Sequence, residues 1–134
     1  MLLEWLSSER QTMLTVHRVS LLVDEELARI TDADLQQRVR DLLVAPYAVE
    51  RDWDYGPLGQ RFTCWTVLEH SPSNTGIAYC QEGFGPGDPW GIVYLSGKHM
   101  NIGMDCSWFP TLETAMRESS AASDISRPKG YLIP

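Results

Sequence analysis

The sequence predicts an α+β fold in a single domain over residues 1–134, with N-terminal helices, then an antiparallel sheet of about four to five strands, then a short C-terminal helix. The length of 134 residues suits one hydrophobic core. Residues 1–46 contain no glycine and one proline, whereas all ten glycines and the other seven prolines follow. Segments without these breakers favour helices, and segments rich in them favour strands with turns. We therefore expect a helical part, a sheet part, a final helix and a tail, at residues 1–46, 47–109, 110–119 and 120–134.

The clearest helix is predicted from Asp32 to Val44. Its apolar residues recur at helical spacing and share one face. Thr31 can cap the first turn, and Pro46 marks the end because a proline disfavours the helical conformation of the residue before it. The apolar face comprises Leu35, Val39, Leu42 and Leu43.

The preceding stretch, from Ser8 to Ile30, is also interpreted as a helix. Ser8 and Gln11 have the spacing of a capping box. The part from Leu14 to Val23 is rich in β-branched residues and is also compatible with a strand, but we prefer the helix. The apolar side of this helix would comprise Met13, His17, Leu21 and Leu22, with His17 half-buried.

Four segments after Pro46 are predicted to be strands that pair as two hairpins. Residues 62–69 and 77–81 form the first, joined by the turn formers at 71–76. Residues 90–95 and 100–104 form the second, around a Ser-Gly-Lys turn, because large side chains alternate along both segments. Short connections of this kind indicate antiparallel pairing with the helices on one face.

The C-terminal part is predicted to begin with a short helix, Leu112 to Ser119, capped by Thr111. Just before it, Trp108 and Phe109 would seat this helix on the sheet. The tail is polar and small before it closes with the apolar run Tyr131–Ile133. We expect the tail to be loose or to dock on the sheet edge through that run.

The charge and the cysteines narrow the class of partner and the compartment. Eleven basic against eighteen acidic residues leave a net charge of −7, so nucleic acid is not an expected partner. The first residues lack the pattern of a signal peptide, and no segment is apolar enough for a membrane helix. An odd number of scattered cysteines, Cys64, Cys80 and Cys106, does not indicate a disulfide framework. We expect a cytoplasmic protein that does not bind membranes.

Cysteine catalysis is the most specific enzyme hypothesis that the sequence offers. Cys106 lies next to Asp105 just after the predicted strand of residues 100–104, and His99 lies near the opposite end of that strand, which suggests a thiolate with a histidine base and a carboxylate. An extended chain separates His99 from Cys106 by roughly 20 Å, so His17 or His70 would have to supply the base. The three cysteines and three histidines lack paired metal-ligand spacing, and no metal or cofactor is expected.

The aromatic residues provide the more informative signal. Eleven of the thirteen lie between Tyr47 and Phe109. Several fall in turn-rich segments, where burial in a regular sheet is difficult, and we expect these to form an exposed anchor cluster beside nearby carboxylates. The expected core aromatics are Trp65, Tyr79 and Tyr94. The expected binding residues are Trp53, Tyr55, Phe84 and Trp90 with Asp52 and Asp54.

In size, acidity and layout the chain resembles small bacterial proteins that neutralise or escort one partner, such as immunity proteins against secreted toxins and acidic secretion chaperones. The resemblance rests on no residue motif, so it assigns no functional residue. It implies a protein-binding module without catalysis, whose acidic surface attracts a basic partner. The alternative is a small enzyme or ligand-binding protein with a Cys/His-based site. A homodimer through the sheet edge or the tail is compatible with both.

Overall fold

The computed structural model describes residues 2–103 and 107–127, and for residues 2–15 the backbone alone. It confirms the predicted α+β layout, with helices first, then the sheet, then a short helix. The helices are α1 (Leu2–Arg29), α2 (Ala33–Leu42) and α3 (Leu112–Glu118). The strands are β1 (Leu43–Asp52), β2 (Arg61–His70), β3 (Thr75–Tyr79), β4 (Trp90–Tyr94) and β5 (Ser107–Phe109). Short 3-10 turns at Ser71–Ser73 and Ser120–Ala122 complete the described elements.

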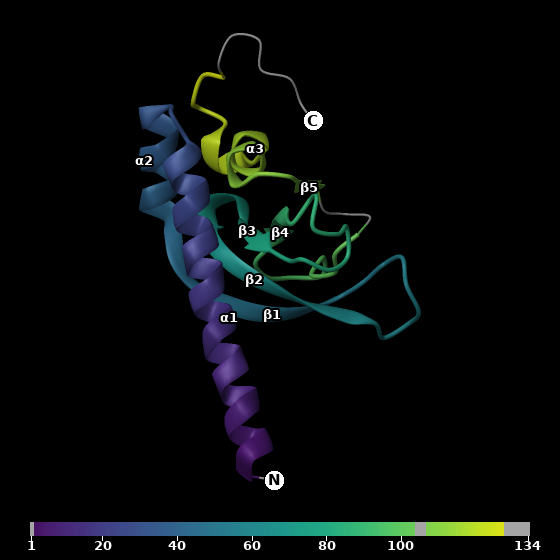
Figure 1. The fold of residues 1–134 in the computed structure, drawn as a ribbon. Coiled ribbons are helices and arrows are strands. Elements are labelled where there is room, and N and C mark those ends of the chain that lie inside the picture. Colours follow the sequence, from purple (N-terminus) through teal and green to yellow (C-terminus); the bar gives the residue numbers. More distant parts are fainter. Residues whose placement is uncertain (1, 104–106, 128–134) are drawn as a thin grey trace.

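The five described strands form one antiparallel sheet in the order β1-β2-β3-β4-β5, so each strand pairs with the next along the chain. The helices lie on one side of this sheet, and the β1–β2 loop projects on the side away from α1 (Figure 1). No helix in the described part of the chain combines the length and apolar character needed to cross a membrane.

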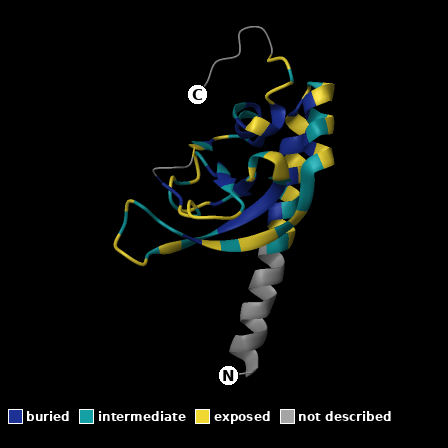
Figure 2. Ribbon diagram, turned by 180° about the vertical axis from the view of Figure 1, so that it is seen from behind, coloured by how far each residue is buried: buried dark blue, intermediate teal, exposed yellow. Residues whose placement is uncertain are grey.

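Side chains alternate between the two faces of the sheet along each strand. A cluster of buried side chains lies on each face. The helix-side core lies between the sheet and the three helices. Its buried members include Val19, Val23, Leu27, Leu35, Val39, Trp65, Val67, Ile77, Trp90, Phe109, Leu112 and Met116. The far-side cluster lies on the other face and comprises Cys64, Ala78, Cys80, Val93 and Ile102, with the half-buried Trp53, Phe62 and Trp108 packed against it. Figure 2 shows the resulting contrast between the buried middle of β2 and the more exposed β1–β2 loop.

α1 is a helix, as preferred, but its start and its buried face differ from the prediction. It begins at Leu2, so the capping-box interpretation of Ser8 is wrong. His17 and Leu21 are exposed, and the buried stripe instead runs through Val19, Val23 and Leu27. Both stripes have helical spacing, and contact with the sheet decides which one is buried.

α2 is shorter than predicted and has a different cap. The side chain of Asp32, not Thr31, accepts hydrogen bonds from the backbone N–H groups of Asp34 (3.0 Å) and Leu35 (3.2 Å). The helix ends at Leu42, because Leu43 already begins strand β1. The two hydrogen bonds to Asp32 satisfy N–H groups that the first turn of a helix leaves without partners.

β1 was not predicted, because Pro46 lies inside it and was interpreted as a helix stop. The strand lies at the edge of the sheet, and its register with β2 shifts between Leu43 and Tyr47. Edge strands and bulges are the two places where a sheet tolerates the missing N–H of proline.

The predicted hairpin of residues 90–95 with 100–104 is wrong. β4 pairs with β5, and Ile102 instead forms an isolated parallel bridge with Trp53. The N–H of Ile102 donates to the carbonyl of Asp52 (2.9 Å), and the N–H of Asp54 donates to the carbonyl of Ile102 (3.0 Å). The segment around residue 102 therefore packs on the far face of the sheet instead of adding a strand to it. The alternation of large side chains along residues 100–104 does not distinguish between these two arrangements.

Buried Arg51 holds part of this cover in place. It is 2% exposed and donates from its two Nη atoms to the carbonyls of Met100 and Tyr94, each at 3.0 Å. A charged side chain is buried at low cost only when its donors find such partners. No pattern in the sequence around Arg51 indicates this buried role.

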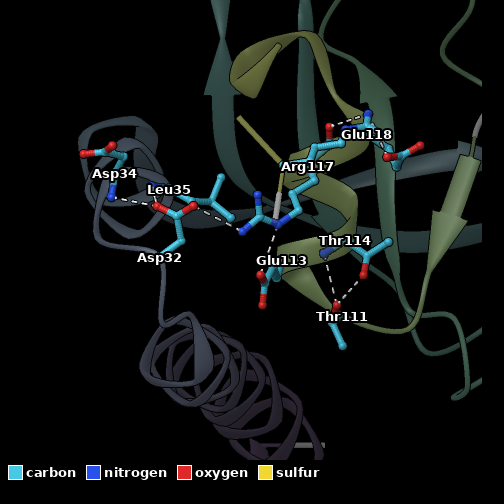
Figure 3. A network of polar contacts seen from close by, with 9 residues as sticks. Asp32, Asp34, Leu35, Thr111, Glu113, Thr114, Arg117 and Glu118 are labelled. Atoms are coloured by element: carbon cyan, nitrogen blue, oxygen red, sulfur yellow. Dashed lines mark hydrogen bonds and ion pairs between the residues drawn. The ribbon is translucent and has the colours of Figure 1, made fainter. Parts of the chain in front are cut away.

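α3 has the predicted cap, with the Thr111 hydroxyl accepting from the N–H of Thr114 at 3.1 Å. Figure 3 shows Arg117 of α3 between Asp32, at 3.5 Å, and Glu113, at 3.1 Å. The described residues that follow α3 are not loose, because Ala121 and Ala122 are buried. The expected docking run Tyr131–Ile133 lies outside the described residues.

Candidate functional site

Three of the four aromatic residues expected to act as anchors meet at one place. We call Trp53, Tyr55 and Phe84 the aromatic patch. The Trp53 ring centroid lies 5.2 Å from that of Tyr55 and 5.1 Å from that of Phe84, and the Tyr55 and Phe84 centroids are 6.1 Å apart. Each pair meets edge to face, at 78°, 82° and 84° respectively. Edge-to-face contacts of this kind are attractive, so the rings hold one another in place.

The patch joins two loops that are distant in sequence. Trp53 and Tyr55 follow β1, whereas Phe84 lies between β3 and β4. Tyr55 is 60% exposed and Phe84 39% exposed, and Leu58 in the same loop as Tyr55 is fully exposed. Exposed apolar groups that gather in one place mark interaction surfaces more often than single ones do.

The far-side cluster supports the patch from beneath. Trp53 contacts Phe62 with centroids 5.5 Å apart, and Phe84 stacks on Trp108 at 6.0 Å with planes 28° apart. Gly83 has a positive φ of 70°, and a Cβ there would lie 3.3 Å from the Trp53 ring. Glycine adopts this conformation without strain, so it lets the chain turn close to the ring and present Phe84.

Trp90 does not belong to the patch, which corrects its predicted role as an exposed anchor. It is 3% exposed and contacts Tyr79, with ring centroids 4.9 Å apart, in the helix-side core. Its place at the start of β4 directs the side chain toward the helices, because successive strand residues face opposite sides. Trp65 and Tyr79 lie in or against the same core, as expected. Tyr94 is half-buried and near His99 instead.

The two carboxylates expected beside the anchors are both engaged. Asp52 accepts from Nε of Arg61 at 2.7 Å, and Asp54 accepts from Nδ2 of Asn101 at 3.2 Å. The pair with Arg61 balances the charge of Asp52, so the patch borders a partly neutralised region rather than a purely anionic one.

A group of acidic residues gathers instead at α2. Asp32, Asp34, Asp41 and Asp124 line an open polar pocket of about 440 Å³ together with Arg38. Arg38 donates to both carboxylate oxygens of Asp124, at 2.8 and 2.9 Å, and this hydrogen bonding lowers the pKa of Asp124 to about 2. Hydrogen bonds from backbone N–H groups, the largest from Leu35, lower the pKa of Asp32. Asp32 and Asp124 are therefore ionised at neutral pH.

The structure describes only some of the residues of the predicted Cys/His-based site. Asp105 and Cys106 lie outside the described residues, so the predicted group of Cys106, Asp105 and His99 stays a prediction. Cys80 is buried and hydrogen-bonds with Cys64 and with the carbonyl of Glu82 rather than with a histidine. The hydrogen bond with Cys64 lowers the pKa of the Cys80 thiol.

The three histidines lie in three different segments, on α1, at the end of β2 and after β4. His17 is exposed on α1, and Nδ1 of His70 lies 2.7 Å from Oγ of Ser73. The His99 ring lies 5.8 Å from Tyr94. Within residues 2–103 and 107–127, no three His, Cys, Asp or Glu side chains converge in a way that would hold a metal ion.

Sequence reasoning missed the residues that support the patch. Phe62 and Trp108 lie beneath it, and Ile102 bridges to Trp53. Leu58 extends the exposed apolar surface, and its place in a Gly-Pro-Leu-Gly turn was a usable signal, because an apolar residue at a turn tip has little to bury it.

The fold and this surface define a small α+β protein that presents a preassembled aromatic surface on two loops of its sheet. Comparison of the chain with protein-family models, with curated proteins and with solved structures gave no match.

Proposed function

We propose that this protein is a non-enzymatic protein-binding module that uses the aromatic patch to anchor one partner. The observation that carries the proposal is the mutual edge-to-face packing of Trp53, Tyr55 and Phe84 while two of the three rings stay exposed. The few residues that carry most of the binding energy of protein interfaces are enriched in Trp and Tyr. Rings that are already held by one another lose little conformational freedom on binding, which favours affinity.

The shape of the patch favours a protein surface over a small ligand. The three rings contact one another directly, with centroids about 5–6 Å apart, so no space for a ligand lies between them. A partner would be met by the exposed rings of Tyr55 and Phe84 and by the fully exposed Leu58 in the same loop as Tyr55.

The charge of the chain favours a basic partner. The net charge is −7, and exposed carboxylates such as Asp34 and Asp41 on α2 add to the field around the molecule. Such a field accelerates association with a basic protein even when the charges do not lie at the contact. An acidic, compact binder of one basic partner fits the class of bacterial immunity-type inhibitors or partner-specific chaperones, and we propose that class.

We propose the cytoplasm as the compartment. The three cysteines are odd in number and scattered along the chain, which does not indicate the disulfide framework of a secreted protein. A homodimer through the sheet edge would leave the aromatic patch available to another partner.

The experiment is a comparison of affinity capture by matched variants. The double variant Tyr55→Ala/Phe84→Ala removes the exposed rings but leaves Trp53 in place. Leu21→Ala is the control, because Leu21 is 46% exposed, as large an apolar exposure as Phe84, but lies on α1. With lysate of the source organism, wild type and Leu21→Ala should retain the same stoichiometric protein and the double variant should lose it. Equal retention by all three, or capture of nothing by wild type, contradicts the proposal.

A further inference from the structure

The two buried cysteines of the far-side cluster lie opposite each other, Cys64 within β2 and Cys80 directly after β3. Trp65 of β2 pairs with Tyr79 of β3 in an antiparallel register. Continuing this register by one residue past the end of β3 places Cys64 opposite Cys80. Both side chains belong to the far-side cluster, so they point to the same face of the sheet.

The backbone of Cys80 decides how close the two side chains come. Its N–H donates to the carbonyl of Pro89 at 2.9 Å, on the β4 side. In an antiparallel ladder a residue whose N–H faces one neighbour makes a non-hydrogen-bonded pair with the other. Cys64 and Cys80 are therefore such a pair, and this is the position at which opposite side chains approach most closely. That approach is compatible with the spacing that a disulfide needs between its Cβ atoms.

We propose that Cys64 and Cys80 form a reversible cross-strand disulfide, with a low-molecular-weight disulfide such as glutathione disulfide as the oxidant. The thiolate of Cys80 attacks one sulfur of the oxidant, which releases one small thiolate and leaves a mixed disulfide on Cys80. The thiolate of Cys64 then attacks the Cys80 sulfur and releases the second small thiolate. The two protons lost by the cysteines end on the two released thiols, and the two electrons of the dithiol reduce the oxidant.

Two observations favour Cys80 as the attacking residue. It lies directly after β3, where the chain leaves the sheet into the loop of residues 81–89, whereas Cys64 lies within β2. Its hydrogen bond with Cys64 also lowers the pKa of the Cys80 thiol, which raises the fraction of thiolate. Since both cysteines are at most 1% exposed, the side chains packed over them must move before a small disulfide can reach the sulfurs.

The disulfide would lie under the aromatic patch. Trp53 and Phe62 pack against the cluster that holds both sulfurs, and the loop that follows Cys80 carries Phe84. Formation of the bond is therefore expected to alter the environment of Trp53 and so the tryptophan fluorescence.

The test is oxidation of the full chain in glutathione buffers of increasing disulfide fraction, followed by acid quenching, alkylation and mass spectrometry. Trypsin cleaves after Arg61 and Lys98, so both cysteines fall in the single peptide 62–98, whereas Cys106 falls in the next one. We expect peptide 62–98 to lose the mass of two hydrogens and to escape alkylation, and dithiothreitol to reverse this. Cleavage after Glu69 should then give two chains joined by one disulfide, which places the bond between Cys64 and Cys80.

Cys106→Ser is the matched control and should keep the product, whereas Cys64→Ser and Cys80→Ser should give only glutathione adducts. The wild-type peptide decides the result even if a variant fails to fold. Absence of the two-hydrogen loss at every glutathione ratio, adducts only, or a bond from Cys106 to either residue overturns the proposal. None of these outcomes involves a protein partner, so the test is independent of the proposed function.

Discussion

The ring of Phe84 meets the ring of Trp53 edge to face, with centroids 5.1 Å apart and planes at 82°. The two residues belong to different loops, one after β1 and one after β3. Their contact is what turns two exposed turns into one surface. Trp53 is held below by Phe62 and Ile102, so the exposed part of the patch rests on a buried one.

Removing an exposed ring should cost far less stability than removing a buried one. Phe84→Ala should lower the free energy of unfolding by about 1–2 kcal/mol, because the side chain is 39% exposed and the loss is limited to its ring contacts with Trp53, Tyr55 and Trp108. Trp90→Ala should lower it by about 3–5 kcal/mol, because it leaves a cavity in the helix-side core. Urea denaturation followed by circular dichroism measures both values. Equal losses would mean that Phe84 is a core residue.

Gly91 should not accept even one methyl group. A Cβ at this position would lie 2.4 Å from the Trp108 ring. Gly91→Ala should therefore lower the free energy of unfolding by about 1–3 kcal/mol through overpacking. Gly87→Ala is the control, because a Cβ there has no neighbour within 4 Å. The expectation fails if chemical denaturation gives the two alanine variants the same midpoint.

Glu26 should matter much more than its neighbour Glu25. Its carboxylate accepts from the N–H of Leu112 at 2.9 Å and from Nη1 of Arg29 at 2.7 Å, and so joins α1 to the start of α3. Glu26→Ala leaves a buried N–H without its acceptor and should cost about 1–3 kcal/mol. Glu25→Ala, on the exposed side of the same helix, should change stability by at most about 0.5 kcal/mol. Thermal unfolding of the two variants makes the comparison, and similar melting temperatures would contradict it.

The ion pair of Arg38 with Asp124 should make stability depend on pH in the acid range. The pair holds the pKa of Asp124 at about 2, below its ordinary value of 3.8. A carboxyl group whose pKa is lower in the folded than in the unfolded state stabilises the fold at any pH above its unfolded-state pKa. This stabilisation is lost as the pH falls from the unfolded-state pKa to the folded-state pKa. The loss attributable to Asp124 should therefore occur between about pH 4 and pH 2, and it should be small because both side chains are partly exposed.

Arg38→Gln should flatten the pH dependence of the urea midpoint in that window, and added salt should weaken the effect in wild type. Arg40→Gln provides the control, since Arg40 is exposed on the same helix. Indistinguishable pH profiles for the two variants would mean that the pair does not contribute.

The candidate site was predictable in part. Trp53, Tyr55 and Phe84 stood out because large rings in turn-rich segments have few regular ways to be buried. Trp90 was predicted to be an exposed anchor for the same reason, and this prediction was wrong. Neighbouring residues of a strand face opposite sides of the sheet, so a shift of one residue in the strand decides whether a side chain faces the helices or the loops. Sequence spacing carries no information on which loops meet, so the support from Trp108 and Ile102 was not foreseen.

Local pattern was sufficient for the α+β layout, for β2 to β4 and for the Thr111 cap of α3, because helix periodicity, strand alternation and capping depend on residues a few positions apart. Contacts between distant segments decided the rest. They selected Val19, Val23 and Leu27 rather than Leu21 for the buried face of α1, admitted Pro46 into an edge strand, and sent Ile102 to Trp53 instead of into a hairpin. In each case two local conformations satisfied the same pattern, and only the apolar surface that a distant element buries makes one of them more stable.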